Sequence, residues 1–391
     1  MKKSLIAVAV ASAFVAPAAM AEVTLSGAIN LGIEIAKSTA GTTPGATSLT
    51  RTLLNSNYSH VDLESVDDIG GGNKVIFHYQ LVAQPQNASA GNTGGPNENY
   101  NRNSFLGIAG GWGAFKMGTN ENVYERMMYT ADPIDGALGP GGNLMILGTP
   151  GGSAFQAGIQ GAVGPQADFY RRTDHTIWYE SPNFSGFSFE IDRTLSAFKT
   201  GGPNGIDPTV TSIGGKFQPE GAPFYVDLAF EQHKDFFGAN AVPAAAGIGT
   251  GTSSTDNGAQ IGGGWIFGDL SLHLRYEILK YKLNGVTAGA SEYKRNAEMI
   301  AVKYNLPSGY VGAEVDIAQS GKTNIGTVSA TGAKMYSVGY FHNLSKQSQL
   351  QFIYGRTDND NNATYGQAGA PNFGLPGTKD DVFHVGLKHT Y

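Results

Sequence analysis

The segment at residues 119–170 is rich in acids and poor in bases. It has no lysine or arginine between Met127 and Tyr170. Its acidic residues are Glu121, Glu125, Asp132, Asp135 and Asp168. Carboxylates around a confined aqueous space attract cations, whereas the same acids on an open surface only keep a loop hydrated. Loops this long are uncommon unless they are functional or disordered, so both interpretations stay open at this point.

Basic side chains that could face these acids lie on neighbouring segments. They are Lys74, Arg102, Lys116, Arg171 and Arg172. Lys74 and Lys116 fall on the polar side of alternating segments, which places them in the more aqueous environment. The alternative is that some of these bases end strands near lipid headgroups, where long side chains reach the interface.

Signals for catalysis or metal binding are weak, and we expect no enzyme, cofactor or metal. The eight histidines are scattered without metal-ligand spacing, and the absence of cysteine excludes a disulfide framework and a thiolate site. The stretch Gly70–Lys74 lacks the spacing of a phosphate-binding loop, so a β-turn is expected. A hydrolase would need a nucleophile, a base and an orienting carboxylate to converge. Ser271 and His273 share a face, with Glu277 as the orienting carboxylate, whereas alternation separates Ser337 from His342.

Apolar and polar residues alternate along most of the chain after residue 21. In the first such segment the apolar face carries Val23, Leu25, Ile29, Leu31, Ile33 and Ile35. Similar segments include residues 74–81, 187–192, 224–231, 270–278 and 383–391. Successive strand residues point to opposite faces, so each segment reads as a strand between an apolar and a polar environment. Lengths of about nine to twelve residues suit tilted membrane strands better than the strands of a soluble sandwich.

Short and long connections alternate between these segments. Short turns are expected at residues 68–73, 110–113, 182–186, 219–222, 268–269, 307–308 and 344–346. Long loops are expected at residues 37–56, 85–100, 119–170, 195–208, 234–256, 283–291, 319–332 and 358–380. If the first and last strands pair, about sixteen antiparallel strands close a transmembrane β-barrel with short periplasmic turns and long external loops.

The N-terminus has the parts of a secretory signal peptide. Lys2 and Lys3 precede an apolar stretch, and Ala19–Ala21 supplies the small residues of a cleavage site. We therefore expect residues 1–21 to be removed and residues 22–391 to form one domain. Loss of the two lysines from 26 basic residues would leave 24 against 32 acidic ones, a net charge of −8. That balance argues against binding to nucleic acid.

The chain resembles the general porins of Gram-negative bacteria, most closely those of β-proteobacteria. The stretches that carry the likeness are Asp67–Gly72, Arg102–Gly107, Tyr179–Phe187, Gly339–Lys346, Asn361–Tyr365 and Val385–Tyr391. The resemblance implies a water-filled channel in the outer membrane for ions and small hydrophilic solutes. It also implies a homotrimer whose third loop, at about residues 119–170, folds into the lumen as the constriction.

Further expectations follow from the resemblance. Glu121, Glu125, Asp132 and Asp135 would form the acidic side of the constriction, and Lys74, Arg102, Lys116, Arg171 and Arg172 the basic side. Tyr391 would be the C-terminal aromatic residue that the barrel-assembly machinery recognises, although phenylalanine is usual there. Outer-membrane lipid and lipopolysaccharide would surround the barrel.

The sequence departs from the family pattern on the basic side. His60 and Glu64 stand where relatives often have arginine and lysine, and Thr119 follows Gly118 where an arginine is common, although Arg102 is retained. Many relatives prefer anions, so these losses favour weak cation selectivity or none. A channel specific for one solute and an adhesin are the alternatives within the same fold.

Overall fold

A computed structural model of the chain describes residues 22–83, 85, 102–134, 139–151, 168–196, 199–201, 205–367, 369–372 and 374–391. Residues 1–21, which we interpret as a signal peptide, lie outside this set, as does Asp135. Among the described residues, no helix is both long and apolar enough to cross a membrane.

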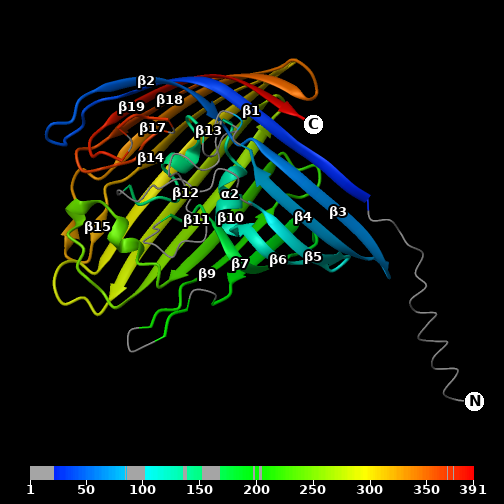
Figure 1. Cartoon of the computed structure of the whole chain (residues 1–391), viewed down its shortest axis with the longest axis horizontal. Helices are drawn as coiled ribbons and strands as arrows, with labels where there is room; N and C mark the ends of the chain where they lie inside the picture. Colours follow the sequence, from blue (N-terminus) through cyan, green and yellow to red (C-terminus); the bar gives the residue numbers. More distant parts are fainter. Residues whose placement is uncertain are drawn as a thin grey trace, which may run out of the picture.

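The described residues form a single antiparallel sheet that curves into a barrel (Figure 1). Its strands are β1 (Glu22–Ser38), β2 (Leu49–Ser56), β3 (His60–Gly70), β4 (Asn73–Val82), β5 (Ser104–Gly110), β6 (Gly113–Glu121), β7 (Arg172–Glu180), β8 (Phe187–Thr194), β9 (Thr209–Phe217), β10 (Phe224–Lys234), β11 (Ser253–Phe267), β12 (Leu270–Asn284), β13 (Glu292–Leu306), β14 (Gly309–Ala318), β15 (Lys322–Thr323), β16 (Gly326–Thr327), β17 (Ala333–Asn343), β18 (Ser348–Asn359) and β19 (Lys379–Thr390). Short helices are α2 (Val123–Tyr129), η1 (Asn143–Met145), η2 (Gly238–Ala241) and η3 (Ala244–Ala246).

The wall of the barrel has sixteen strands, as the sequence predicts. β2 and β3 both pair with β1, the former along its second half and the latter along its first, so they act as one interrupted strand. β15 and β16 are two-residue strands within the connection that follows β14. β1 pairs with β19 over the whole stretch from Ala28–Thr390 to Ser38–Asp380, and this pairing closes the cylinder.

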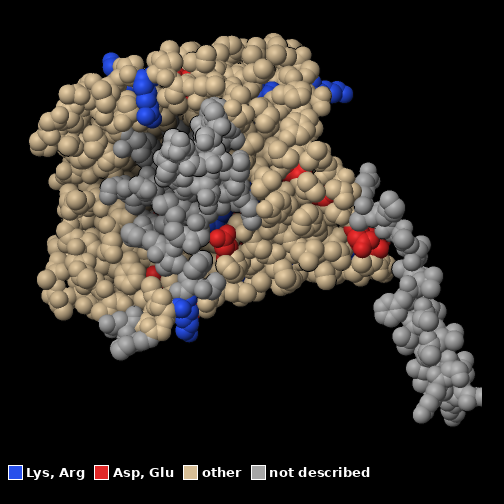
Figure 2. All heavy atoms as spheres, viewed as in Figure 1, with Lys and Arg blue, Asp and Glu red and all other residues tan. Residues whose placement is uncertain are grey.

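Alternation places apolar side chains outside the barrel and polar side chains inside. Leu25, Leu228 and Ile300 are more than half exposed on the outer face. Inward residues, such as Asp227 on β10 and Glu277 on β12, are buried. The described surface in Figure 2 accordingly carries few charged side chains. An apolar exterior with buried charges is the reverse of a soluble protein and matches a barrel in lipid.

The seven short turns lie where the sequence predicts them. In the turn between β3 and β4, Gly71 and Gly72 have φ of 63° and 76°, which glycine adopts without strain. The stretch Gly70–Lys74 is therefore a hairpin, as expected.

Two predicted long loops are shorter than the sequence suggests. The prediction of a loop at residues 37–56 was wrong over its second half, because Leu49–Ser56 forms β2 and pairs with Leu31–Ser38. Likewise β11 begins at Ser253, inside the range assigned to the loop at 234–256. In both cases cross-strand pairing extends into sequence without regular alternation: Leu53 and Leu54 are adjacent in β2, and the start of β11 is polar.

Candidate functional site

The connection between β6 and β7 lies inside the barrel. Its described parts contact the inner face of the wall, with α2 against β8, β9, β10 and β11 (Figure 1). Further along, the amide of Gly141 donates to Gln367 Oε1 at 2.8 Å, and the amide of Thr364 donates to the carbonyl of Gly151 at 3.0 Å. The third loop is therefore folded into the lumen, as the sequence analysis expects.

The wall determines where α2 begins. The first amides of a helix have no partner within the helix. Here the amide of Val123 donates to Asp192 Oδ2 at 2.9 Å, and that of Tyr124 donates to Ser212 Oγ at 3.0 Å. A helix of seven residues is marginally stable by itself, and Asn122 gives it no side-chain cap. Inward side chains of β8 and β9 supply the missing hydrogen-bond acceptors.

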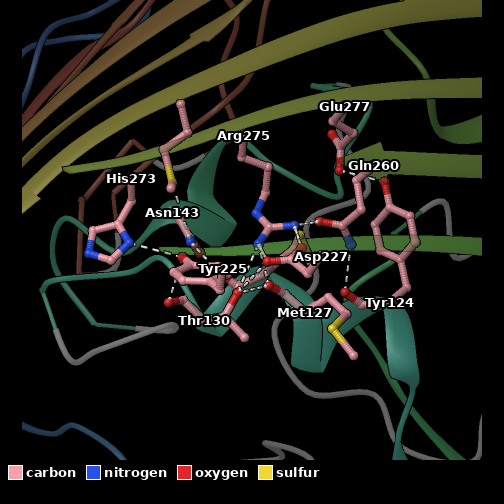
Figure 3. Close-up of polar contacts among 12 residues, drawn as sticks. Tyr124, Met127, Thr130, Asn143, Tyr225, Asp227, Gln260, His273, Arg275 and Glu277 are labelled. Carbon is pink, nitrogen blue, oxygen red and sulfur yellow. Dashed lines mark hydrogen bonds and ion pairs between the residues drawn. The ribbon is translucent and has the colours of Figure 1, made fainter. Parts of the chain in front are cut away.

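Arg275 on β12 binds the other end of α2 (Figure 3). Its guanidinium forms an ion pair with Asp227 on β10 at 2.8 Å, and both side chains are fully buried. It also donates to the carbonyl of Met127 at 2.5 Å and to Thr130 Oγ1 at 3.0 Å. One guanidinium therefore joins two wall strands to the C-terminal end of the helix.

A second buried ion pair holds the next part of the loop. Arg295 on β13 contacts Glu277 on β12 at 2.9 Å and donates to the carbonyl of Ile146 at 2.8 Å. Glu277 in turn accepts hydrogen bonds from the amide of Gly148 at 2.8 Å and from the hydroxyl of Tyr124 at 2.9 Å. Each charge thus satisfies its partner and a polar group of the loop.

Four of the predicted site residues meet where the loop leaves and rejoins the wall. Glu121 forms ion pairs with Arg172 and, at 3.4 Å, with Arg102. Arg172 also lies 3.9 Å from Glu125, and the Arg102 guanidinium stacks 4.0 Å from the centre of the Tyr58 ring. The acids and bases that the sequence analysis set on opposite sides of a gap are in direct contact here.

The other predicted residues lie apart from this cluster. Lys116 pairs with Glu180 at 2.7 Å, and Lys74 is exposed beside the turn between β3 and β4. The Arg171 guanidinium stacks 4.3 Å from the centre of the Phe236 ring. Asp132 accepts a hydrogen bond from the amide of Ile134 at 2.7 Å, further along the loop.

Glu125 is a buried acid within this arrangement. Only 1 % of the residue is exposed, and its Oε1 accepts a hydrogen bond from the Tyr129 hydroxyl. Burial, and then the negative charge of Glu121, raise the pKa of Glu125 to about 8. The carboxyl therefore keeps its proton at neutral pH.

The hydrolase alternative lacks an orienting carboxylate. Ser271 Oγ lies 3.1 Å from His273 Nε2, as expected from their shared face. The other ring nitrogen of His273 contacts the Tyr225 hydroxyl at 2.9 Å, while Glu277 is engaged by Arg295 and the loop. In the described part of the chain, no group of three or more His, Cys, Asp or Glu side chains is arranged to hold a metal ion.

Sequence reasoning missed the residues that hold the loop in place. The sequence analysis assigns no role to Asp227, Arg275 or Arg295, and it considers Glu277 only as the orienting carboxylate of a hydrolase. The available signal was a charged residue at an inward position in the middle of a long strand, because such a charge needs a buried partner. Arg275 and Glu277, two residues apart on β12, show that signal most clearly.

The fold and its lumen define a transmembrane barrel channel with an internal loop. The Gram-negative porin family model matches residues 7–362, and the chain belongs to this family. It is an outer-membrane channel for passive diffusion of ions and small hydrophilic solutes, and it is not an enzyme.

Individual relatives agree with this assignment. The chain is 26% identical to outer membrane porin protein 32 of Delftia acidovorans, with all of both chains covered. Its fold matches the anion-selective porin from Comamonas acidovorans with a TM-score of 0.72 and 21% identity, covering 95% of this chain and all of the other. It also matches in vitro folded OmpT of Vibrio cholerae in a trimer form, with a TM-score of 0.62 and 12% identity over 95% and 99% of the two chains.

Removal of Arg275 should destabilise the protein strongly. Arg275→Met leaves Asp227 as a buried charge without its partner, which costs about 3–5 kcal/mol. The control is Arg356→Met, which breaks pairs with Asp358 and Asp381 whose side chains are about one-third exposed. Its expected cost is at most about 1 kcal/mol. Urea unfolding in detergent, followed by tryptophan fluorescence, compares the two, and equal losses would contradict the assigned role of Arg275.

The protonation of Glu125 should make stability depend on pH. An unfolded glutamate loses its proton near pH 4.3, whereas folded Glu125 keeps it to about pH 8. Because the folded state binds more protons between these values, the free energy of unfolding contributed by Glu125 falls as pH rises from about 5 to 8. The slope is at most about 1.4 kcal/mol per pH unit.

We expect Glu125→Gln to flatten this slope in urea titrations at pH 5.5, 7.0 and 8.5. Glu298→Gln, at an exposed outward position, serves as the control and should leave the slope unchanged. An identical slope in wild type and Glu125→Gln would show that Glu125 does not retain its proton.

Proposed function

We propose that residues 119–170 form the constriction of the channel. The described parts of this segment are held against the inner face of β8 to β13 by the contacts of Arg275 and Arg295. Inward side chains on β3 and β4 keep contact with solvent, and half of the Glu64 side chain is exposed. This supports a solute path between the loop and the β3–β4 wall.

Charge compensation in the lumen supports weak cation selectivity. Arg102 and Arg172 share the single charge of Glu121, so this cluster keeps one net positive charge while Glu125 is protonated. Lys116 is neutralised by Glu180. Of the predicted residues, the proposal keeps Glu121, Glu125, Arg102 and Arg172 at the constriction; Lys74 lies beside a short turn and is left out. On the facing wall the ion-pair partners of Asp62 and the half-exposed Glu64 among the described residues are His60 and His78, whose charge is absent when they are unprotonated. The negative wall then has no compensating lysine or arginine among these contacts.

The assembly proposed for this chain is a homotrimer, each barrel with its own channel. A trimer form is described for the Vibrio cholerae relative, which shares the fold. We also propose that residues 1–21 are a signal peptide and that the assembly machinery recognises Tyr391. The Tyr391 side chain is 44% exposed, and its backbone pairs with Gly27 at the seam of the barrel.

A row of lysines on the outer face supports lipopolysaccharide as a partner. Lys280 lies directly opposite Lys294, which lies directly opposite Lys322. These three neighbouring positions are at the end of the barrel that carries the long loops. Glu292 accompanies Lys280 at 3.0 Å. Like charges directly opposite one another destabilise a sheet, and phosphate groups between them would remove that cost.

The selectivity proposal is tested by the reversal potential of single channels in a planar bilayer under a potassium chloride gradient. We expect conductance in steps of three and a small cation preference. Asp62→Asn combined with Glu64→Gln should shift the reversal potential towards anions, because it removes the uncompensated negative charge of the wall. An anion preference in the wild type would contradict the charge argument, and a folded barrel without conductance would contradict the open channel.

The lipid partner is tested by the triple variant Lys280→Gln, Lys294→Gln and Lys322→Gln. We expect several-fold weaker binding of lipopolysaccharide in native mass spectrometry, and in the wild type a binding strength that falls with added salt. Lys346→Gln, in a short turn at the other end of the barrel, is the matched control. Equal binding by the triple variant and this control would exclude the lysine row as the contact.

A further inference from the structure

Two acids on β14 differ from the other buried acids of the lumen. Glu314 and Asp316 point inward two residues apart and are 2% and 0% exposed. No amide, hydroxyl or basic group among the described residues donates a hydrogen bond to any of their four carboxylate oxygens, and the two carboxyl groups lie within hydrogen-bonding reach of each other. By contrast, several other buried inward acids each contact a basic side chain: Asp227 (Arg275), Glu277 (Arg295), Glu231 (His233) and Glu34 (His384).

Neutral oxygens without donors surround the same place. Ser337 on β17 lies directly opposite Glu314 on the same inward face, so the two side chains are neighbours. Only 6% of Ser337 is exposed, and its hydroxyl oxygen has no hydrogen-bond partner among the described residues. This hydroxyl is a separate buried polar group beside Glu314, on the side where the loop passes at Gly141.

The loop contributes a further oxygen. The Asn143 side chain is fully buried, and its Oδ1 also has no partner among the described residues. Its amide nitrogen contacts Sδ of Met299 at 3.6 Å, and Met299 lies directly opposite Asp316 in the sheet.

The loop passes close to these acids on both sides. A Cβ added at Gly312 would lie 2.6 Å from the carbonyl oxygen of Pro133, and one added at Gly141 would lie 2.7 Å from Ser337 Oγ. Gly312 precedes Glu314 by two residues on the same face of β14. The carboxylates are therefore enclosed between the wall and the loop, and the negative charge of Asp132 acts on both.

We propose that Glu314 and Asp316, with Ser337 and Asn143, form a calcium site that ties the constriction loop to β14. Ionised carboxylates cannot share a hydrogen bond, and two of them buried side by side need a positive charge between them. The available ligands are all hard oxygens, without thiolate or imidazole, which excludes the preferences of zinc and copper. An irregular set of carboxylate, hydroxyl and amide oxygens suits Ca²⁺ better than Mg²⁺, which demands near-octahedral geometry.

Two carboxylates with neutral oxygens predict modest affinity. Calcium sites of low ligand charge bind with dissociation constants of about 10⁻⁴ to 10⁻³ M. Concentrations in this range suit a protein exposed to the medium. The ion would hold the loop through β14, next to the contacts that Arg275 and Arg295 make on β12 and β13. The consequence for the channel rests on the proposed constriction, whereas binding of the ion does not.

Calcium binding is measured on full-length barrel refolded without lipopolysaccharide and treated with EDTA, by equilibrium dialysis and calorimetry with calcium chloride. We expect one ion per chain to be lost, or bound at least tenfold more weakly, in Glu314→Gln with Asp316→Asn. The control is Asp62→Asn with Glu64→Gln, an inward pair of the same spacing on β3 whose acids contact histidines. That variant should keep the ion.

A second measurement separates the ion from a shared proton. The infrared band of a protonated carboxyl should be absent from the Glu314–Asp316 pair at neutral pH with calcium and appear after EDTA treatment. A band unaffected by calcium, or equal calcium binding in wild type and Glu314→Gln with Asp316→Asn, would overturn the proposal. Both readouts are independent of conductance, so a failed constriction would leave them unchanged.

Discussion

Closure of the backbone hydrogen-bond network around the cylinder is the constraint on which the rest of the structure depends. In a bilayer every backbone polar group must find a partner in the protein, and only pairing of the first strand with the last achieves this for a sheet. The long register between β1 and β19 meets that requirement. Once the cylinder is closed, alternation determines the environment of every side chain in the wall: successive residues face the lipid and the confined interior in turn.

The confined interior in turn explains why the loop is held by charges. Inward positions are polar because the lumen of such a barrel is aqueous, and the loop that enters it removes water from some of them. Arg275 and Asp227 remain tolerable because they neutralise each other and bind Met127 and Thr130 of the loop. The same contacts that place the loop therefore satisfy the wall, and neither would be stable without the other.

The sequence predicted the barrel well because its signal is local. Alternation and turn residues placed the seven short turns, and resemblance indicated that the third loop enters the lumen. Pairing between distant strands was beyond reach, which is why β2 was assigned to a loop and why the contact of Arg172 with Glu121 was not foreseen. Lys74 shows the same limit of local prediction. Alternation correctly places its side chain on the inward face but does not give its position along the barrel axis, which is far from that of Arg102.

Charge number alone is a poor guide to what such a channel admits. Most arginines and several acids in the described lumen form pairs, so they contribute short-range contacts and little net field. A side chain influences passing ions when it is exposed to the lumen and lacks an opposite charge, and Glu64 meets the first condition better than the buried Glu125 does. The replacement of basic residues by His60 and Glu64 on this wall therefore weighs more heavily than the overall net charge. Burial decides which charges hold the loop, and exposure decides which of them an ion in the channel encounters.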